Sequence, residues 1–216
     1  MSLENSLGSQ GPDRRKRRDT VRVAGSLGPW DLVSELGRGS FGIVYEARNA
    51  QTGVRAAVKV MKGAGPVDPL DVRRFQREIA LLARLDHANV VRTLDSGVTG
   101  GVPWVALELV EGRPLQEVGL DLPQFVDVLA KIARAVGAAH RAQVIHRDLK
   151  PGNILIDEKT GAPKVLDFGL AFDARLDASR LSRTGEIAGT PAYFAPEVLR
   201  GGHGPDDPRR DVYALG

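Results

Sequence analysis

Asp148 begins a short polar segment whose side chains could act together on a phosphoryl group. Its carboxylate can accept a hydrogen bond from an attacking hydroxyl, and the ammonium of Lys150 can meet the charge on the group that moves. Asn153 and Asp167 carry oxygen ligands of the kind that Mg²⁺ prefers. These residue types, in this order, indicate metal-assisted chemistry on phosphate.

A glycine-rich segment, Gly37-Arg38-Gly39-Ser40-Phe41-Gly42, could bind phosphate through its backbone. Its spacing alone is weak evidence, because such glycines also form ordinary turns and occur at the strand-to-helix turn of dinucleotide-binding folds. Here the β-prone residues 43–45 follow, so we expect the glycines at the tip of a β-hairpin. Without Cβ atoms, the backbone N–H groups of this hairpin can approach phosphates closely.

Lys59 lies at the end of an apolar strand-like segment, Ala56-Ala57-Val58-Lys59. A strand lysine usually points to solvent, but Glu78 gives this one a candidate partner. Glu78 shares a helical stripe with Phe75 and Leu82, and a carboxylate turned towards a core needs a cation. We therefore predict an ion pair between Lys59 and Glu78 that holds the ammonium where an anionic ligand can meet it.

The elements that must position these residues follow from the hydrophobic pattern. Short β-prone runs between residues 30 and 60 are separated by a hairpin signal at residues 49–53, and strands are expected at residues 90–94 and 102–109. Helices are expected at residues 67–85 and after Asp121, with helical sequence returning only near Ala195. The apolar faces of the first two helices are formed by Phe75, Ile79, Leu82 and Leu85, and by Leu122, Phe125, Leu129, Ile132 and Val136.

Composition sets the limits of the function. Of the 216 residues 42% are apolar, as in a soluble globular protein, and no stretch approaches the ~20 apolar residues that cross a bilayer. Cysteine is absent, and the histidines at 87, 140, 146 and 203 show no zinc-binding spacing. The net charge of +3 owes much to the arginine-rich residues 14–18, which could contact nucleic acid or lipid but are better explained as part of a solvated, disordered leader over residues 1–28.

Taken together, the motifs resemble the catalytic domain of the eukaryotic-like serine/threonine protein kinases of bacteria, over about residues 30–216. The carriers are the glycine-rich segment, Lys59, Glu78, His146-Arg147-Asp148-Leu149-Lys150-Pro151-Gly152-Asn153 and Asp167-Phe168-Gly169. Further matches are Gly189-Thr190-Pro191-Ala192-Tyr193, Ala195-Pro196-Glu197 and Asp211-Val212-Tyr213-Ala214-Leu215-Gly216. Lys150 and Thr190 follow the serine/threonine rather than the tyrosine kinase pattern.

The resemblance implies an α+β, two-lobed protein-kinase-like fold, with a β-rich N-lobe at residues 29–109 and a mainly helical, incomplete C-lobe at residues 110–216. It implies ATP and Mg²⁺ as cofactors. The catalytic roles fall to Asp148, Lys150, Lys59 and Glu78, and the metal ligands are Asn153 and Asp167. Nucleotide binding falls to Gly37, Gly39, Ser40, Phe41, Gly42, Val44, Ala57, Lys59, Leu107, Glu108, Leu109 and Leu155.

Within that set the resemblance gives particular roles. Val44, Ala57 and Leu155 would sandwich the adenine ring, and Leu107 would limit the depth of the pocket. Glu108 and Leu109 would offer backbone hydrogen bonds to the base. Arg147 could bind a phosphate on the activation segment, with Thr184 expected first and Ser182 second, while Ser179 is expected to be an ordinary loop residue.

Other expectations concern the rest of the molecule. A complete domain of this family would continue for about a third of its length again, and would supply a late arginine to pair with Glu197. The 216 residues alone are therefore expected to expose apolar C-lobe surface around Leu129, Ile132 and Val136 and to transfer phosphate poorly. The resemblance implies protein substrates, a cytoplasmic location and possible self-association for autophosphorylation. Neither a nucleic-acid partner nor a membrane segment in this chain is expected.

Two other classes of protein would share much of this sequence. A pseudokinase or scaffold usually lacks Lys59, Asp148 or Asp167, all of which are present here. A small-molecule phosphotransferase of kinase-like fold would keep the Asp148 and Asp167 chemistry but not the protein-substrate segment that ends at Glu197. A serine/threonine protein kinase remains the favoured hypothesis.

Overall fold

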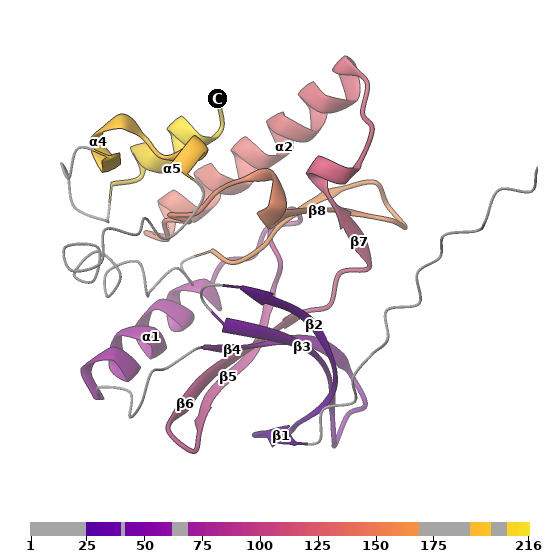
Figure 1. Ribbon diagram of the computed structural model, residues 1–216, viewed down its shortest axis with the longest axis vertical. Coiled ribbons are helices and arrows are strands. Elements are labelled where there is room, and N and C mark those ends of the chain that lie inside the picture. The colour runs from indigo at the N-terminus through magenta and orange to yellow at the C-terminus, as the bar shows by residue number, and fades with distance from the viewer. Residues whose placement is uncertain (1–24, 40–41, 62–68, 169–190, 200–206) are drawn as a thin grey trace, which may run out of the picture.

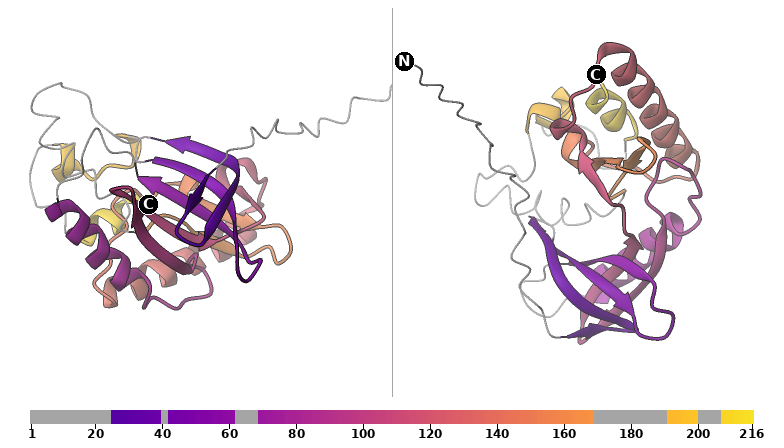
Figure 2. Two further views of the ribbon diagram at one scale, coloured as in Figure 1. Left: turned by 90° about the horizontal axis from the view of Figure 1, so that it is seen from below. Right: turned by 90° about the vertical axis from the view of Figure 1, so that its right-hand side faces the viewer.

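The structure is a computed structural model, and it describes residues 25–39, 42–61, 69–168, 191–199 and 207–216. Two parts are evident in Figure 1: a strand-rich half that holds the earlier segments, and a half built around a long helix that holds the later ones. The side view in Figure 2 shows the same division. The α+β, two-lobed architecture predicted from the sequence is confirmed.

A six-stranded antiparallel sheet forms the N-terminal half, in the order β1-β2-β3-β4-β6-β5. Its strands are β1 (Ser26–Leu27), β2 (Trp30–Gly39), β3 (Gly42–Asn49), β4 (Arg55–Met61), β5 (Thr93–Thr99) and β6 (Val102–Glu108). Asn49 makes the turn between β3 and β4, because its side-chain Oδ1 accepts hydrogen bonds from the backbone N–H groups of Gln51 and Thr52. Gly53 completes that turn with a φ of 71°.

Helix α1 (Pro69–Leu82) covers the sheet on the side of β5 and β6. Its stripe of Phe75, Ile79 and Leu82 is buried, as the spacing predicts, and Leu85 is buried just beyond its end. The helix is shorter than the expected residues 67–85, and residue 67 itself lies outside the described residues. The apolar spacing therefore identified the buried face correctly and the bounds only approximately.

The C-terminal half is built on α2 (Leu122–Arg141). Asp121 caps this helix with a reciprocal capping box: its side chain accepts from the N–H of Gln124, and the Gln124 side chain accepts from the N–H of Asp121. Beside α2 lies a small sheet in the order β7-β8-β9, made of β7 (Gly112–Pro114), β8 (Ile154–Asp157) and β9 (Pro163–Val165). The remaining elements are η1 (Leu115–Glu117), η2 (Pro151–Asn153), η3 (Pro191–Tyr193), α4 (Pro196–Leu199) and α5 (Arg209–Ala214).

The predicted buried face of α2 is only half correct. Ile132 and Val136 are buried together with Val128, but Leu122 is 74% exposed and Phe125 is 43% exposed. The burial of Ile132 and Val136 also contradicts the expectation that both side chains are partly exposed in this chain. The second half of α2 packs against β9 and the cluster around Val144 and Leu149, whereas its first turns border an open groove.

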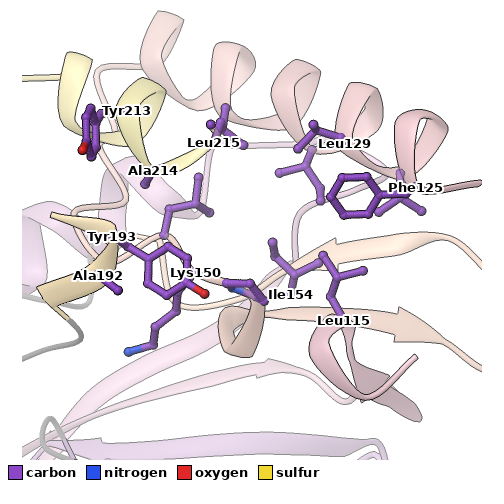
Figure 3. Close-up of a pocket in the computed structure, with 15 residues that line it drawn as sticks. Leu115, Phe125, Leu129, Lys150, Ile154, Ala192, Tyr193, Tyr213, Ala214 and Leu215 are labelled. Carbon is purple, nitrogen blue, oxygen red and sulfur yellow. The ribbon is translucent and has the colours of Figure 1, made fainter. Parts of the chain in front are cut away.

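That groove has a volume of about 460 Å³ and lies between α2, η2 and α5. In Figure 3, Phe125 and Leu129 project from α2 towards Ile154 and Leu115, while Tyr193 and Leu215 lie nearer its other end. Its lining is mostly apolar, and apolar surface of this kind is what the sequence predicts for the C-lobe.

Two other segment boundaries differ from the prediction. The strand expected at residues 90–94 begins only at Thr93, because Val90 instead forms an isolated parallel bridge with Val165 of β9. The predicted leader, residues 1–28, is mostly outside the described residues, but Ser26 and Leu27 pair with β2 as β1. The division between lobes at residues 109 and 110 stays a prediction; β6 ends at Glu108 and β7 begins at Gly112.

One continuous apolar cluster joins α1, β6, α2, β8 and β9, and therefore connects the two halves. A second, smaller cluster lies within the six-stranded sheet around Trp30 and Trp104. Across the described ranges, no helix combines the length and apolar character needed to span a membrane.

Candidate active site

Lys59 and Asp167 meet in an ion pair between the two halves of the molecule. The Nζ of Lys59, on β4, lies 2.9 Å from the Oδ2 of Asp167, just after β9. Lys59 is only 5% exposed, and a buried ammonium needs such a counter-charge. Asp167 takes up the left-handed conformation, with a φ of 57°, which is uncommon for residues other than glycine, although aspartate is among those that adopt it more often. Two residues distant in sequence, both predicted for the site, are thus in direct contact.

Glu78 lies against Arg147, a contact that the sequence analysis did not predict. The Nη1 of Arg147 donates to the Oε1 of Glu78 over 3.0 Å, and both side chains are largely buried. This contact links α1 to the segment that carries Asp148. Arg147 supplies a cation of the kind that the Glu78 carboxylate needs. The ion pair between Glu78 and Lys59 stays a prediction.

The Asp148 carboxylate is held by two of its predicted neighbours. Lys150 Nζ lies 2.7 Å from Asp148 Oδ2, and the Nδ2 of Asn153 donates both to that oxygen, over 3.1 Å, and to the Asp148 carbonyl, over 2.7 Å. Lys150 has an extended backbone, and the turn η2 that follows brings Asn153 back to Asp148. These bonds fix the orientation of a carboxylate that remains 14% exposed.

Asp211 anchors the backbone of the same segment, although the sequence argument gave it no site role of its own. Its carboxylate is buried and accepts hydrogen bonds from the backbone N–H groups of His146 and Arg147, at 2.8 and 2.9 Å. His140 Nε2 lies 2.8 Å from the same carboxylate. Three partners in a buried position make Asp211 a positioning residue. The sequence offered one indication of this role, which is that Asp211 stands at the start of an apolar helical segment.

His146 supports the segment from the interior. Its Nε2 lies 2.8 Å from the carbonyl of Leu166, and its Nδ1 accepts from the Asp148 N–H at 3.3 Å. The ring also contacts Phe168, with centroids 4.8 Å apart. Complete burial lowers the pKa of this imidazole below its ordinary value of 6.5, against the opposing charges of Asp211, Asp167 and Asp148. His146 is therefore a neutral donor near neutral pH, with the proton on Nε2.

Within the glycine-rich segment, Gly39 ends β2 and pairs with Gly42, which begins β3, so the two strands form a hairpin. A Cβ on Gly42 would lie 2.2 Å from the carbonyl oxygen of Val60, so the neighbouring strand leaves room only for glycine. The hairpin placement excludes the strand-to-helix turn of a dinucleotide-binding fold. Ser40 and Phe41, both predicted to bind nucleotide, lie outside the described residues.

The residues predicted to hold the adenine ring come from both halves. Val44 and Ala57 are half-buried on adjacent strands of the large sheet, and Leu155 is half-buried on β8. Leu107 is buried at 8% exposure near the end of β6. Glu108 ends that strand and Leu109 follows it. We call residues 108–111, which lead from β6 to β7, the linker. The contact of these residues with a nucleotide stays a prediction.

The residues predicted to hold Mg²⁺ offer oxygens of the right kind. The amide nitrogen of Asn153 is turned to Asp148, which directs its oxygen the other way, and Asp167 has a partly exposed carboxylate. Among the described residues no group of three or more His, Cys, Asp or Glu side chains could hold a metal ion by itself. A pair of protein oxygens nevertheless fits Mg²⁺, which commonly completes its shell with phosphate and water.

Several predicted segments lie wholly or partly outside the described residues. They include Ser179, Ser182 and Thr184, together with Gly189 and Thr190. The next segment is described: Ala195 is buried, and Pro196 and Glu197 begin α4.

Comparison with known proteins adds independent information. The family model of the protein kinase domain matches residues 30–216. The chain is 40% identical over 197 residues to the DNA damage-responsive serine/threonine-protein kinase RqkA of Deinococcus radiodurans, covering 88% of this chain and 29% of RqkA. It is 38% identical over 199 residues to the serine/threonine-protein kinase PknA of Mycobacterium tuberculosis, covering 88% of this chain and 45% of PknA.

Among solved structures, the chain is similar to the kinase domain of PknI from Mycobacterium tuberculosis. The TM-score is 0.69 at 27% sequence identity, with 89% of this chain and 72% of the PknI chain covered. The chain spans less than half the length of the two curated relatives above.

Proposed function

The chain belongs to the protein kinase family, and from that premise we propose that it transfers the γ-phosphoryl group of ATP to serine and threonine hydroxyls of proteins. The observation that carries the proposal is the placement of two assemblies around His146, whose ring contacts Phe168 beside Asp167 and accepts from the backbone N–H of Asp148. One is the Lys59–Asp167 ion pair, and the other is the Asp148 carboxylate with Lys150 and Asn153. No member of this catalytic set is replaced.

Binding of ATP would use both halves. The hairpin tip at Gly39 and Gly42 would lie over the phosphates, while Lys59 would meet them with a charge that the protein has already positioned. The base would lie between Val44, Ala57 and Leu155, next to Leu107 and the backbone of Glu108 and Leu109. Positioning of this kind supplies most of the catalysis in phosphoryl transfer, where the protein performs little covalent chemistry.

Transfer would centre on Asp148. Its carboxylate accepts the hydrogen bond of the substrate hydroxyl and orients the oxygen towards the γ-phosphorus. The bond from that oxygen to phosphorus forms while the bond from phosphorus to the β–γ bridging oxygen breaks. ADP leaves, and the hydroxyl proton passes to Asp148 and then to solvent. Lys150, 2.7 Å from Asp148, would meet the charge on the moving group.

Asn153 and Asp167 would hold Mg²⁺. When bound, the ion neutralises charge on the phosphates of ATP. Both proposed ligands are also held by the protein: Asp167 pairs with Lys59, and the Nδ2 of Asn153 donates to Asp148.

Phosphorylation of the segment before Thr190 would regulate the activity, with Thr184 favoured first and Ser182 second. Arg147 is the proposed receptor for the phosphate, because it immediately precedes Asp148. In the structure Arg147 pairs with Glu78, so a phosphate would compete with Glu78 for the same guanidinium. Mass spectrometry of ATP-treated protein tests this: phosphate found only outside residues 170–190, in a fully active protein, would contradict it.

The direct test of the proposed function is the chemical identity of the product. Full-length protein is incubated with γ-labelled ATP and Mg²⁺, alone and with a generic basic protein, and the labelled amino acids are identified. We expect phosphoserine or phosphothreonine. Label in a small molecule would indicate a small-molecule phosphotransferase, and no label with intact nucleotide binding would indicate a pseudokinase.

A further inference from the structure

Glu108, the last residue of β6, has a carboxylate held by a lysine side chain and a backbone N–H group. The Nζ of Lys164 donates to both of its oxygens, at 3.1 and 3.2 Å, and the backbone N–H of Arg92 donates to Oε2 at 3.3 Å. The backbone N–H of Glu108 donates in turn to the carbonyl of Arg92, at 2.9 Å. Both the main chain and the side chain of this linker residue are therefore fixed.

Lys164 reaches Glu108 from the other half of the molecule. It lies on β9, directly opposite Leu155 of β8 in the sheet register, so the two side chains share one face. Three residues after Lys164 comes Asp167, which pairs with Lys59. Strand β9 therefore carries Lys164, which holds the linker, and is followed by Asp167, which is proposed for the phosphate end of the site.

The surroundings of this pair differ from those of the other charged contact on the linker. Glu111 also bridges the halves, with Arg55 at 2.8 Å and Lys159 at 2.9 Å. The side chains of Arg55 and Lys159 are 49% and 75% exposed, whereas those of Lys164 and Glu108 are 19% and 33% exposed. Exposed pairs are screened by solvent, so the Glu108–Lys164 contact is expected to have the larger effect.

We propose that Lys164 is a positioning residue for nucleotide binding, which fixes through Glu108 the linker backbone against which the base binds. The inference rests on the proposed ATP site. Without the Lys164 charge, the Glu108 carboxylate keeps the Arg92 N–H but loses its tie to β9. The linker can then shift relative to Leu155, and the base end of the site is disturbed while the phosphate end at Lys59 is not.

The experiment measures binding of three probes to full-length protein by calorimetry: ATP, adenosine and inorganic triphosphate. Lys164→Met should weaken ATP and adenosine by about three- to tenfold and leave triphosphate unchanged. The KM for ATP should rise by the same factor with kcat within about twofold, as for a loss of ground-state binding. Lys164→Arg should restore binding, and the exposed control Lys159→Met should bind all three probes like the parent.

Glu108→Gln supplies a second, independent route, because it keeps the shape of the side chain and removes the charge that Lys164 binds. It should weaken adenosine as Lys164→Met does, and the two changes combined should have no greater effect than either alone. Parent-like adenosine binding in Lys164→Met or Glu108→Gln would overturn the inference. So would an equal loss for triphosphate, which would mean a general structural role. Failure of the parent itself to bind ATP would instead overturn the proposed function.

Discussion

Helices α1 and α2 both carry an apolar stripe, yet they differ in how much of it is covered. The α1 stripe of Phe75, Ile79 and Leu82 is buried along its length, whereas α2 buries its stripe only from Val128 onward. Phe125 borders the groove shown in Figure 3. The difference teaches that an apolar stripe predicts which face of a helix is buried. How much of that face is buried depends on the elements that pack against the helix.

The largest difference between the two stripes should appear in stability. Phe75→Ala removes a ring that is 3% exposed within the shared core and should lower the free energy of unfolding by about 3–5 kcal/mol. Phe125→Ala, at a ring that is 43% exposed, should cost less than about 1 kcal/mol. Denaturant unfolding of both variants measures the contrast. Equal losses would show that the first turns of α2 are covered in solution.

The next effect concerns the ion pair that joins the half containing α1 to the half containing α2. Lys59→Met should lower turnover by on the order of 10²-fold or more, because a positioned charge at the phosphates is lost. Folding should stay nearly intact. Steady-state kinetics with a thermal melt test this, and Lys131→Met, at an exposed pair within α2, is the matched control. Parent-like turnover in Lys59→Met would show that the assigned nucleotide site is wrong.

A smaller effect is expected for the contact between α1 and the segment that carries Asp148. Double-mutant cycles can compare the coupling of Glu78 with Arg147 and with Lys59. The 3.0 Å contact between two largely buried side chains predicts a coupling of about 1–2 kcal/mol for Glu78 and Arg147. The same cycle for Glu78 and Lys59 tests the ion pair predicted from the sequence. No measurable coupling between Glu78 and Arg147 would contradict the contact seen in the structure.

The smallest effect is a pH dependence within the half that contains α2. Burial lowers the pKa of His146, so between its ordinary value of 6.5 and its lowered value the unfolded chain binds a proton that the folded one does not. Stability therefore falls as the pH drops below 6.5, by at most about 1.4 kcal/mol per pH unit from this residue. Unfolding of the parent and of His146→Gln at pH 7.5 and 5.5 measures the difference. A slope that the variant retains in full would mean that other groups cause it.

The sequence predicted some features well because they depend on local chemistry. The hairpin at the glycine-rich segment, the turn after Asn49 and the start of α2 at Asp121 each follow from residue types that favour one backbone geometry. The residue types of Asp148, Lys150 and Asn153 likewise identified one short segment as the site of chemistry, although their mutual contacts were not predicted. Such features need no knowledge of distant parts of the chain.

Features that depend on distant segments were predicted less well. The contact of Glu78 with Arg147 was not predicted, because it depends on how α1 lies against the catalytic segment. The exposure of Phe125 depends on what stands opposite α2, and the role of Asp211 depends on α5 lying under His146. In each case the residue type indicated the kind of interaction: a cation for Glu78, burial for Phe125 and hydrogen-bond donors for Asp211. The tertiary structure determined which residues provide that interaction.

The measurement that most directly tests the account is phosphoryl transfer by the full-length protein with Asp148→Asn, compared with the parent and with Asp127→Asn on the exposed side of α2. The account predicts transfer to serine or threonine by the parent, a loss of about 10²- to 10⁴-fold in Asp148→Asn, and no change in ATP binding or in Asp127→Asn. Transfer by Asp148→Asn at the parent's rate would contradict the central claim.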